Sequence, residues 1–416
     1  MKNISRFFTL YWIIYFPTCI AYNDLPGFSS VDEVMMGILL VYTFMMYSNR
    51  SINRRPWKEF MVCYSVIAFY TIYSLIFGAN VSGGVWLDLM QEVRPFTMVF
   101  CTWILNPRFT KNQKKWMLAS MVLTLFSWIA YHPESFESAN AEFPVLGQLA
   151  ICTGMAWYLF TKNTKRNRYI AVALVLTGMV APKFKFMGEV VCFIAFVFYV
   201  KNRLNFKSPK TIIYCLLIIT IILTVTWARV DVYYVSGLQN EELARPMSYK
   251  TSLKILYDYF PFGSGMGSFA CNGAWKFFSP LYYKYNLTGI WGLSPEMGYF
   301  ICDAYYPTLA QFGIVGVFFF CWFWKRRLVA FNQIEDMRYY RVAMLTFCCL
   351  AIEQTADSSW LSGKGMGYCM LIALCLNANR NMMEQRRREE MRKEMMEKRR
   401  MAANSENEQL KLAEKI

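Results

Sequence analysis

Residues 211–228, TIIYCLLIITIILTVTWA, contain no charged side chain. A helix needs about 20 mainly apolar residues to cross a bilayer core. Similar runs recur throughout the 416-residue chain, so we predict an all-α, polytopic integral membrane protein with about 12 transmembrane helices. The apolar runs lie at 7–22, 32–47, 59–78, 85–105, 115–132, 144–161, 168–182, 186–200, 211–228, 302–324, 338–356 and 361–378.

The composition supports a membrane protein over a soluble or nucleic-acid-binding one. Hydrophobic residues make up 56% of the chain and charged residues 17%, whereas a soluble domain carries about 25% charge. The net charge of +16 comes from short basic clusters between apolar runs, as the positive-inside rule produces. We therefore predict no nucleic-acid partner. Most of the 13 cysteines lie inside apolar runs without metal-binding spacing, so we predict no metal and no cofactor.

The charges between the runs predict the topology. Basic clusters such as Arg54 and Arg55 follow the even-numbered runs, which places both termini in the cytoplasm. We assign 1–378 to a transmembrane domain that includes a large, partly helical outer loop at 229–301. Residues 379–416 form a charged cytoplasmic helical tail, either solvated or held near anionic lipid headgroups.

Several cations depart from this pattern and are candidates for binding an anion. Lys183 and Lys185, in APKFKFMGE, lie at the outer surface; they either snorkel to lipid phosphates or bind an anionic ligand. In the outer loop, Arg245 and Lys250 accompany a predicted amphipathic helix at 247–260. Arg94, in DLMQEVRPF, needs a partner on another helix or a ligand.

The stretch FPFGSGMGSF, residues 260–269, places Gly263, Gly265 and Gly267 at alternate positions. Their spacing does not fit a nucleotide or dinucleotide loop. Alternate glycines either form a backbone nest for an anion or make a turn packed beneath the outer loop. Asp303, at the start of the run at 302–324, either caps that helix or orients a hydroxyl nucleophile.

These elements, in this order, resemble the C-terminal signature of the O-antigen ligase and polymerase family. The resemblance rests on Arg245 with its helix, on PFGSGMGSF, on Asp303 with Tyr306, and on the Gly-x-x-Gly at 313–316. KFKFMGE and EVRPF are similar to earlier family elements. The resemblance implies a metal-independent glycosyltransferase at the outer face of the bacterial inner membrane. Its substrates would be polyprenyl-diphosphate-linked oligosaccharides as donor and acceptor.

The resemblance also implies roles for individual residues. Arg245 and Asp303 would be catalytic, with Asp303 as the first candidate for the general base. Cations would stabilise the leaving diphosphate. The implied diphosphate or substrate contacts are Arg94, Lys183, Lys185, Arg245, Lys250, Gly263, Gly265, Gly267 and Tyr306.

One departure favours a polymerase of O-antigen or capsular type over a ligase. Ligases of the family use a histidine late in the large loop, whereas the only histidine here is His132, in a different loop. A ligase acting on a lipid or protein acceptor remains an alternative. A lipid-linked oligosaccharide flippase or secondary transporter is a second one, although the chain lacks the repeat symmetry typical of transporters. Membrane lipids and a chain-length regulator or flippase are the expected partners.

Overall fold

The computed structural model describes residues 2–24, 27–28, 30–49, 52–132, 144–180, 183–205, 207–239 and 242–413. Within these ranges the chain is all-helical, without strands, which confirms the predicted fold class. The α-helices are α1 Lys2–Asp24, α2 Val31–Met45, α3 Trp57–Phe77, α4 Ser82–Leu105, α5 Lys111–Tyr131, α6 Pro144–Phe160, α7 Lys165–Leu176, α8 Phe184–Ile194, α9 Pro209–Val230, α10 Ala244–Asp258, α11 Asn272–Lys276, α12 Leu281–Lys284, α13 Tyr305–Thr308, α14 Gly313–Asn332, α15 Met337–Glu353 and α16 Met366–Ala413.

The membrane character of the chain rests on four of these helical segments. Lys2–Tyr22, Trp57–Phe77, Pro209–Val235 and Tyr305–Asn332 are the described helices long and apolar enough to cross a bilayer. Each of the twelve predicted apolar runs coincides at least in part with a helix. The count of twelve spans stays a prediction, because the remaining helices are shorter or less apolar.

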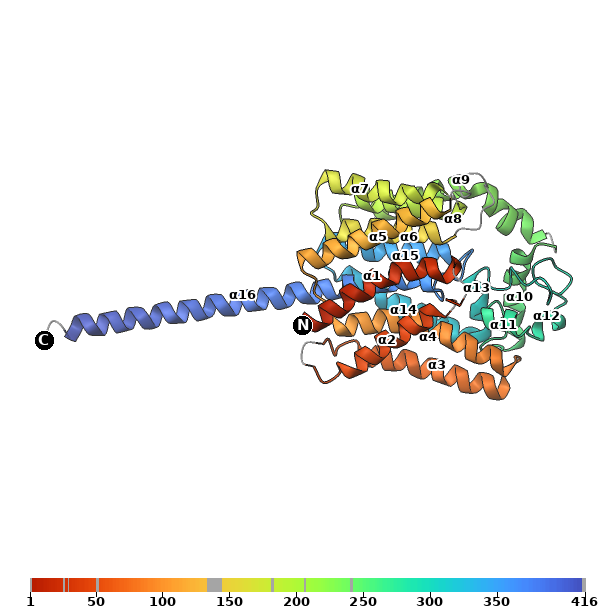
Figure 1. Ribbon diagram of the computed structural model, residues 1–416, viewed down its shortest axis with the longest axis horizontal. Coiled ribbons are helices and arrows are strands. Elements are labelled where there is room, and N and C mark those ends of the chain that lie inside the picture. The colour runs from red at the N-terminus through yellow and green to blue at the C-terminus, as the bar shows by residue number, and fades with distance from the viewer. Residues whose placement is uncertain are drawn as a thin grey trace.

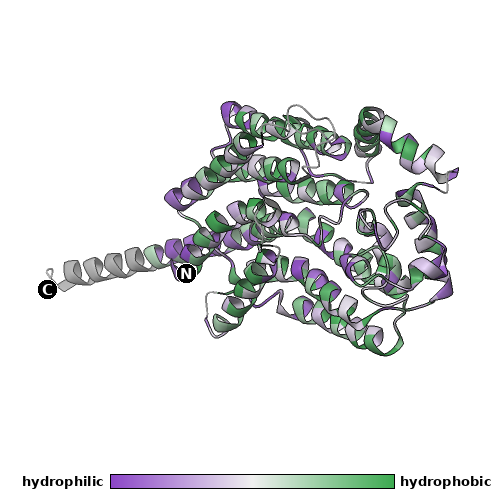
Figure 2. Cartoon of the chain, turned by 45° about the vertical axis from the view of Figure 1, so that its right-hand side comes forward, coloured by the Kyte–Doolittle hydropathy of each residue, from purple (hydrophilic) through white to green (hydrophobic). Residues whose placement is uncertain are grey.

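Helix α9 shows why the surrounding medium must be apolar. Thr226 is its one buried residue, and Ile213, Tyr214 and Leu216 are more than half exposed. Figure 2 shows the hydrophobic colour over much of this helix. A soluble protein rarely exposes an apolar surface of this extent, whereas lipid tails would solvate it.

The first part of α16 lies at the centre of the bundle. Residues 368–373, YCMLIA, are fully buried, as expected of a helix that is apolar on all sides. This part of α16 packs against α4 and α15. The same helix then continues through the charged tail to Ala413 and projects from the bundle (Figure 1). The predicted tail is therefore helical as far as Ala413.

A helical cap covers the end of the bundle opposite the projecting part of α16 (Figure 1). It contains α10, α11 and α12, which fall within the residue range 229–301 of the predicted outer loop. The helix predicted at 247–260 is α10. Phe269, Tyr282, Leu287 and Leu293 form a separate apolar core inside the cap. This core holds the cap as a packed unit over the ends of the bundle helices.

A group of three charged side chains joins α3 to α14. Glu59 accepts hydrogen bonds from Arg326 and Arg327. The Arg327 side chain is buried, and its guanidinium lies 4.7 Å from the ring centroid of Trp103. Burying a guanidinium is costly unless a carboxylate compensates its charge, so Glu59 fixes the position of α14 against α3.

We expect Glu59→Gln to lower the free energy of unfolding by about 1–3 kcal/mol, because it leaves a buried guanidinium without its carboxylate. Thermal unfolding of the full chain in detergent measures the change. Glu335→Gln is the matched control. The pair of Glu335 with Arg386 is largely exposed and should contribute less than about 1 kcal/mol. Equal losses in the two variants would contradict this account.

Candidate functional site

The loop between α15 and α16, residues 354–365, connects the bundle to the cap. Its carbonyl groups accept hydrogen bonds from side chains that are distant in sequence. The Thr355 carbonyl accepts from the hydroxyls of Tyr234 at 2.6 Å and Tyr249 at 3.0 Å. The Leu361 carbonyl accepts from Arg94. These hydrogen bonds hold side chains from the segment after α9, from α10 and from α4 against the 354–365 loop.

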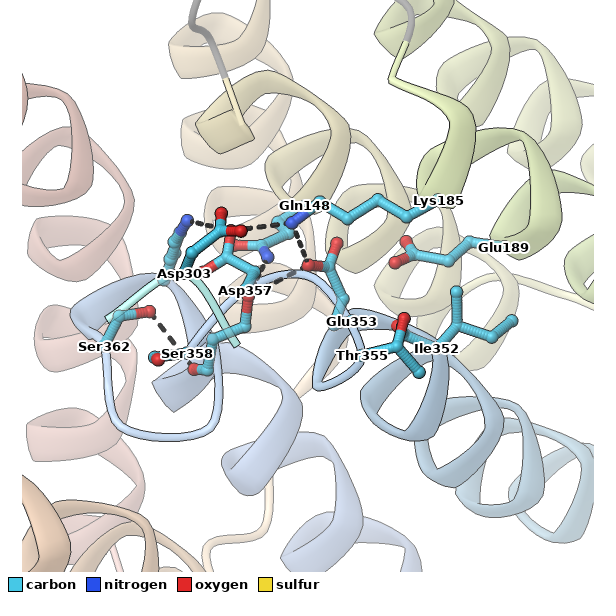
Figure 3. Close-up of polar contacts among 12 residues, drawn as sticks. Gln148, Lys185, Glu189, Asp303, Ile352, Glu353, Thr355, Asp357, Ser358 and Ser362 are labelled. Carbon is cyan, nitrogen blue, oxygen red and sulfur yellow. Dashed lines mark hydrogen bonds and ion pairs between the residues drawn. The ribbon is translucent and has the colours of Figure 1, made fainter. Parts of the chain in front are cut away.

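Lys185 occupies the centre of the charged cluster at this loop (Figure 3). Its Nζ lies 2.6 Å from Glu353 Oε2 and 2.6 Å from Asp357 Oδ2. Lys364 adds a second ammonium, 2.7 Å from the same Asp357 oxygen. We call Lys185, Glu353, Asp357 and Lys364 the outer ion cluster, because they lie at the end of the bundle that the cap covers (Figure 1), where the 354–365 loop contacts α10. It joins α8, α15 and the 354–365 loop.

The electrostatics of Asp357 reflect this arrangement. Burial alone would raise the pKa of its carboxyl, but Lys185 and Lys364 reverse that effect and hold the pKa below its ordinary value of 3.8. Asp357 is therefore ionised at neutral pH and compensates both ammonium groups.

A buried polar network continues from the outer ion cluster into the bundle. Ser359 Oγ donates to Glu353 Oε2 at 3.0 Å, and Gln148 donates to Ser359 Oγ. Glu189, one turn beyond Lys185 on α8, is fully buried and lies beside Glu353. Tyr368 places its hydroxyl 3.5 Å from Glu189 Oε2. Buried ionisable groups in a membrane protein are costly to retain and mark functional sites by default.

Arg245 and Asp303 form a second ion pair beside this cluster. Arg245 Nη2 lies 2.5 Å from Asp303 Oδ2, and its Nε donates to the same oxygen at 2.7 Å. The Arg245 guanidinium lies 4.2 Å from the ring centroid of Tyr233. Burial raises the pKa of Asp303, and the charge of Arg245 opposes that increase. Asp303 also interacts electrostatically with Asp357 and Lys185, so the two sets of charges are neighbours.

These contacts show what Asp303 does locally. The predicted helix-capping alternative is wrong for this side chain, because the residue at the N-cap of α13 is Ala304 and no side chain caps it.

The other predicted contacts include Tyr306, Lys250 and Lys183. Tyr306, on α13, donates its hydroxyl to the Ala351 carbonyl at 3.0 Å. Lys250 lies half-buried on α10, the helix that carries Arg245. Lys183 is the N-cap residue of α8 and is half-buried.

Arg94 pairs with carboxylates on another helix, which is one of the two alternatives that its sequence context predicted. Its Nη1 lies 2.7 Å from Asp32 Oδ2, and its Nη2 lies 2.5 Å from Glu33 Oε1. Both carboxylates belong to α2, and the Arg94 side chain is only 2% exposed. Arg94 therefore ties α4 to α2 and, through the Leu361 carbonyl, to the 354–365 loop.

The three glycines form a packed turn. Gly263 N donates to the Tyr259 carbonyl at 2.7 Å, and Gly265 N donates to the Gln311 carbonyl at 2.9 Å. Gly267 N donates to Asp88 Oδ2 at 3.0 Å. All three amides are thus used inside the protein. The contacts support the packed-turn alternative and not the interpretation in which these amides bind a ligand. The anion held by Gly267 is the protein's own Asp88 carboxylate.

Sequence reasoning missed several residues of the site. Glu353 falls inside the predicted apolar run at 338–356, and Lys364 falls inside the run at 361–378. Asp357 was not singled out. One signal could have found them. An ionisable residue at the end of an apolar run, followed by the polar stretch ADSS at 356–359, marks a costly interruption between two spans.

Neither a comparison with protein-family models nor one with curated proteins finds a match for the chain.

In the described part of the chain no three His, Cys, Asp or Glu side chains are grouped so that they could hold a metal ion. His132 ends α5 and packs its ring 4.5 Å from that of Trp128.

We expect Gly267→Ala to destabilise the protein by about 1–3 kcal/mol, the cost of a strained backbone conformation. Its φ is +73°, and an added Cβ would lie 2.4 Å from the backbone carbon of Gly84. Gly289→Ala is the control within the cap, because a Cβ there would meet nothing within 4 Å. Thermal unfolding in detergent measures both, and an unchanged Gly267→Ala melting temperature would count against the packed turn.

We expect Asp357→Asn to lower the free energy of unfolding at pH 7 by about 1–3 kcal/mol, because two ammonium groups lose their shared carboxylate. The folded pKa of Asp357 lies below 3.8, so its stabilisation is present above that pH and is lost as the pH falls below it. The difference between wild type and variant should therefore shrink at pH values below 3.8.

Unfolding midpoints from pH 7 down to about pH 2, well below the ordinary pKa of an aspartate, check this expectation. Asp258→Asn is the control. The Asp258 carboxylate accepts from Tyr285 at 2.6 Å, but the contact is exposed and should contribute little at any pH. A gap between wild type and Asp357→Asn that widened in acid would contradict the assigned ionisation.

Proposed function

We propose that the protein is a polysaccharide polymerase that transfers a glycan from a polyprenyl-diphosphate-linked donor to a carrier-linked acceptor at the outer face of the bacterial inner membrane. The observation that carries the proposal is the pair of Arg245, on α10 of the cap, with Asp303, which lies beside the outer ion cluster. Cations and a carboxylate are thus held together at the cap end of the bundle. The resemblance to the O-antigen ligase and polymerase family suggested this reaction for the same two residues.

The cations supply the stabilisation that the leaving group needs. As the bond between the donor C1 and the phosphate oxygen breaks, its electron pair moves to the diphosphate, which gains negative charge. Arg245, with Lys185 nearby, offers positive charge for this group without a metal ion. Both cations are paired with carboxylates in the resting protein, so the diphosphate would exchange with these partners.

The exchange gives Asp303 its role as general base. When Arg245 turns to the diphosphate, Asp303 loses the charge that opposes the rise in its pKa. The carboxylate then becomes more basic and accepts the proton of the acceptor hydroxyl as its oxygen bonds to C1. The proton goes to Asp303 and the electron pair to the diphosphate, so the step balances.

The remaining parts of the proposal follow from the charge pattern. Twelve spans with both termini in the cytoplasm would place the cap outside, where a flipped lipid-linked substrate is available. Lys183, Lys250 and Tyr306 are proposed substrate contacts. Lys183 is the N-cap residue of α8, the helix of Lys185, and Lys250 lies on α10, the helix of Arg245. Tyr306 lies on α13, which begins two residues after Asp303. Arg94 is proposed to position the 354–365 loop, because two carboxylates already hold it.

One observation favours a second candidate, a proton-coupled transporter. Glu92, Glu189 and Glu353 are almost fully buried within helices, and buried carboxyls form proton relays in transporters. A transporter requires a sealed bilayer, whereas a glycosyltransferase does not. The two candidates can therefore be separated in detergent.

We expect Arg245→Ala to reduce polymer formation by about 100-fold or more, the usual loss when a transition-state donor is removed. The assay incubates the purified full chain in detergent with a carrier-linked oligosaccharide and measures chain elongation by gel electrophoresis. Lys254→Ala is the matched control, because Lys254 lies on the same helix but is exposed.

Normal elongation by Arg245→Ala would remove Arg245 from the mechanism. No elongation by wild type in detergent, together with proton-dependent uptake in sealed vesicles, would favour the transporter. Asp303→Asn should keep the protein folded, because the amide oxygen still accepts from Arg245, and should lose activity at every pH. Activity restored to Asp303→Asn at high pH would instead identify another group as the base.

A further inference from the structure

A cavity of about 520 Å³ lies at the end of the bundle from which α16 projects, opposite the candidate site. Its size falls in the range of about 300–1,000 Å³ that is usual for small-molecule sites. Residues from the α4–α5 connection and from α5, α6, α15 and α16 line it. The cavity therefore lies between the start of the projecting tail and the neighbouring helix ends of the bundle.

The cavity is cationic. Arg108, Lys114 and Arg388 line it, and no carboxylate of the described residues pairs with Lys114 or Arg388. Arg108 pairs with Glu384, but Glu384 also compensates Arg380 at 2.6 Å. One carboxylate thus serves two arginines, and the cavity keeps a net positive charge that would attract an anion.

The cavity also offers a buried hydrogen-bond acceptor without a partner. Asn377 is 2% exposed, and its Nδ2 donates to the Thr102 carbonyl at 3.1 Å. Its Oδ1 accepts no hydrogen bond from any described residue. Leaving a buried acceptor unpaired is costly, so Asn377 favours a ligand that carries a donor. A ligand with both an anionic group and a hydroxyl fits these needs together.

The apolar lining of the cavity and its position near the membrane–water interface favour an amphiphilic ligand. Phe109, Phe160 and Leu374 supply apolar lining. Lys111, Lys115 and the exposed Trp116 lie on the first turns of α5, next to Lys114, and tryptophan with basic residues is typical of the membrane–water interface. The lining and the interfacial level of the cavity together suit a ligand that keeps its head in the cavity and its chains in the bilayer.

We propose that this cavity binds the headgroup of an acidic glycerophospholipid whose head carries a hydroxyl, of the phosphatidylglycerol type. The phosphodiester lies among Arg108, Lys114 and Arg388, and a glycerol hydroxyl donates to Asn377 Oδ1. Because Asn377 and Arg388 belong to α16, the lipid joins the tail helix to α5 and α6. This site is independent of the glycosyl transfer proposed at the other end of the molecule.

Native mass spectrometry of the full chain in neutral detergent tests the proposal, with phosphatidylglycerol, phosphatidic acid, phosphatidylcholine and inorganic phosphate as probes. We expect phosphatidylglycerol to bind more tightly than the other three. The double variant Lys114→Gln/Arg388→Gln should lower its affinity by about 25-fold, or roughly fivefold for each cation removed. The matched control, Lys115→Gln/Arg387→Gln, changes neighbouring exposed cations outside the cavity and should stay within about twofold.

Equal losses in the two double variants would overturn the site, as would equal binding of phosphatidylcholine and phosphatidylglycerol. Phosphatidic acid equal to phosphatidylglycerol would refute the role of Asn377, and full competition by inorganic phosphate would assign the cavity to a free anion. Circular dichroism and gel filtration of each variant exclude unfolding as the cause of lost binding.

Discussion

The arrangement of the candidate site depends on the two carboxylates that hold Lys185. Glu353 ends α15 and Asp357 lies in the loop that follows, so one ammonium group fixes that loop to α8. Charges that are largely shielded from water, as these three are, are tolerable only when each is paired and hydrogen-bonded. Ser359, Gln148 and Lys364 complete that pairing. The loop fixed in this way then provides the carbonyl groups that orient Tyr234, Tyr249 and Arg94.

Much of the helical fold could be predicted from the sequence, because apolar periodicity and turn residues act locally. The run at 211–228 became α9 and the amphipathic stretch at 247–260 became α10, each with its bounds shifted by a few residues. The site was harder to predict. Arg245 and Asp303 could be singled out as charges in unusual places, but their 2.5 Å contact joins residues of different elements. The 354–365 loop was missed because its partners come from many distant segments of the chain, which no local pattern records.

The glycine stretch illustrates the same limit. Its sequence required a special backbone, and all three glycines do adopt positive φ. What the amides bind depended on tertiary context. The same sequence could form a nest for an external anion or a nest occupied by Asp88. In the folded protein α4 lies against the turn, and its Asp88 occupies the nest. Buried amides are satisfied wherever the chain provides an acceptor.

The continuity of α16 has a mechanical consequence. From Met366, next to the outer ion cluster, to Ala413 the helix contains no proline and, after Gly367, no glycine. At about 1.5 Å per residue, it is a rod of roughly 70 Å. Such a rod cannot tilt at one end alone. If the 354–365 loop rotated when ion-pair partners exchange, the rod would carry that rotation to its charged far end as a larger displacement, and the tail would act as a lever that reports on the opposite side of the molecule.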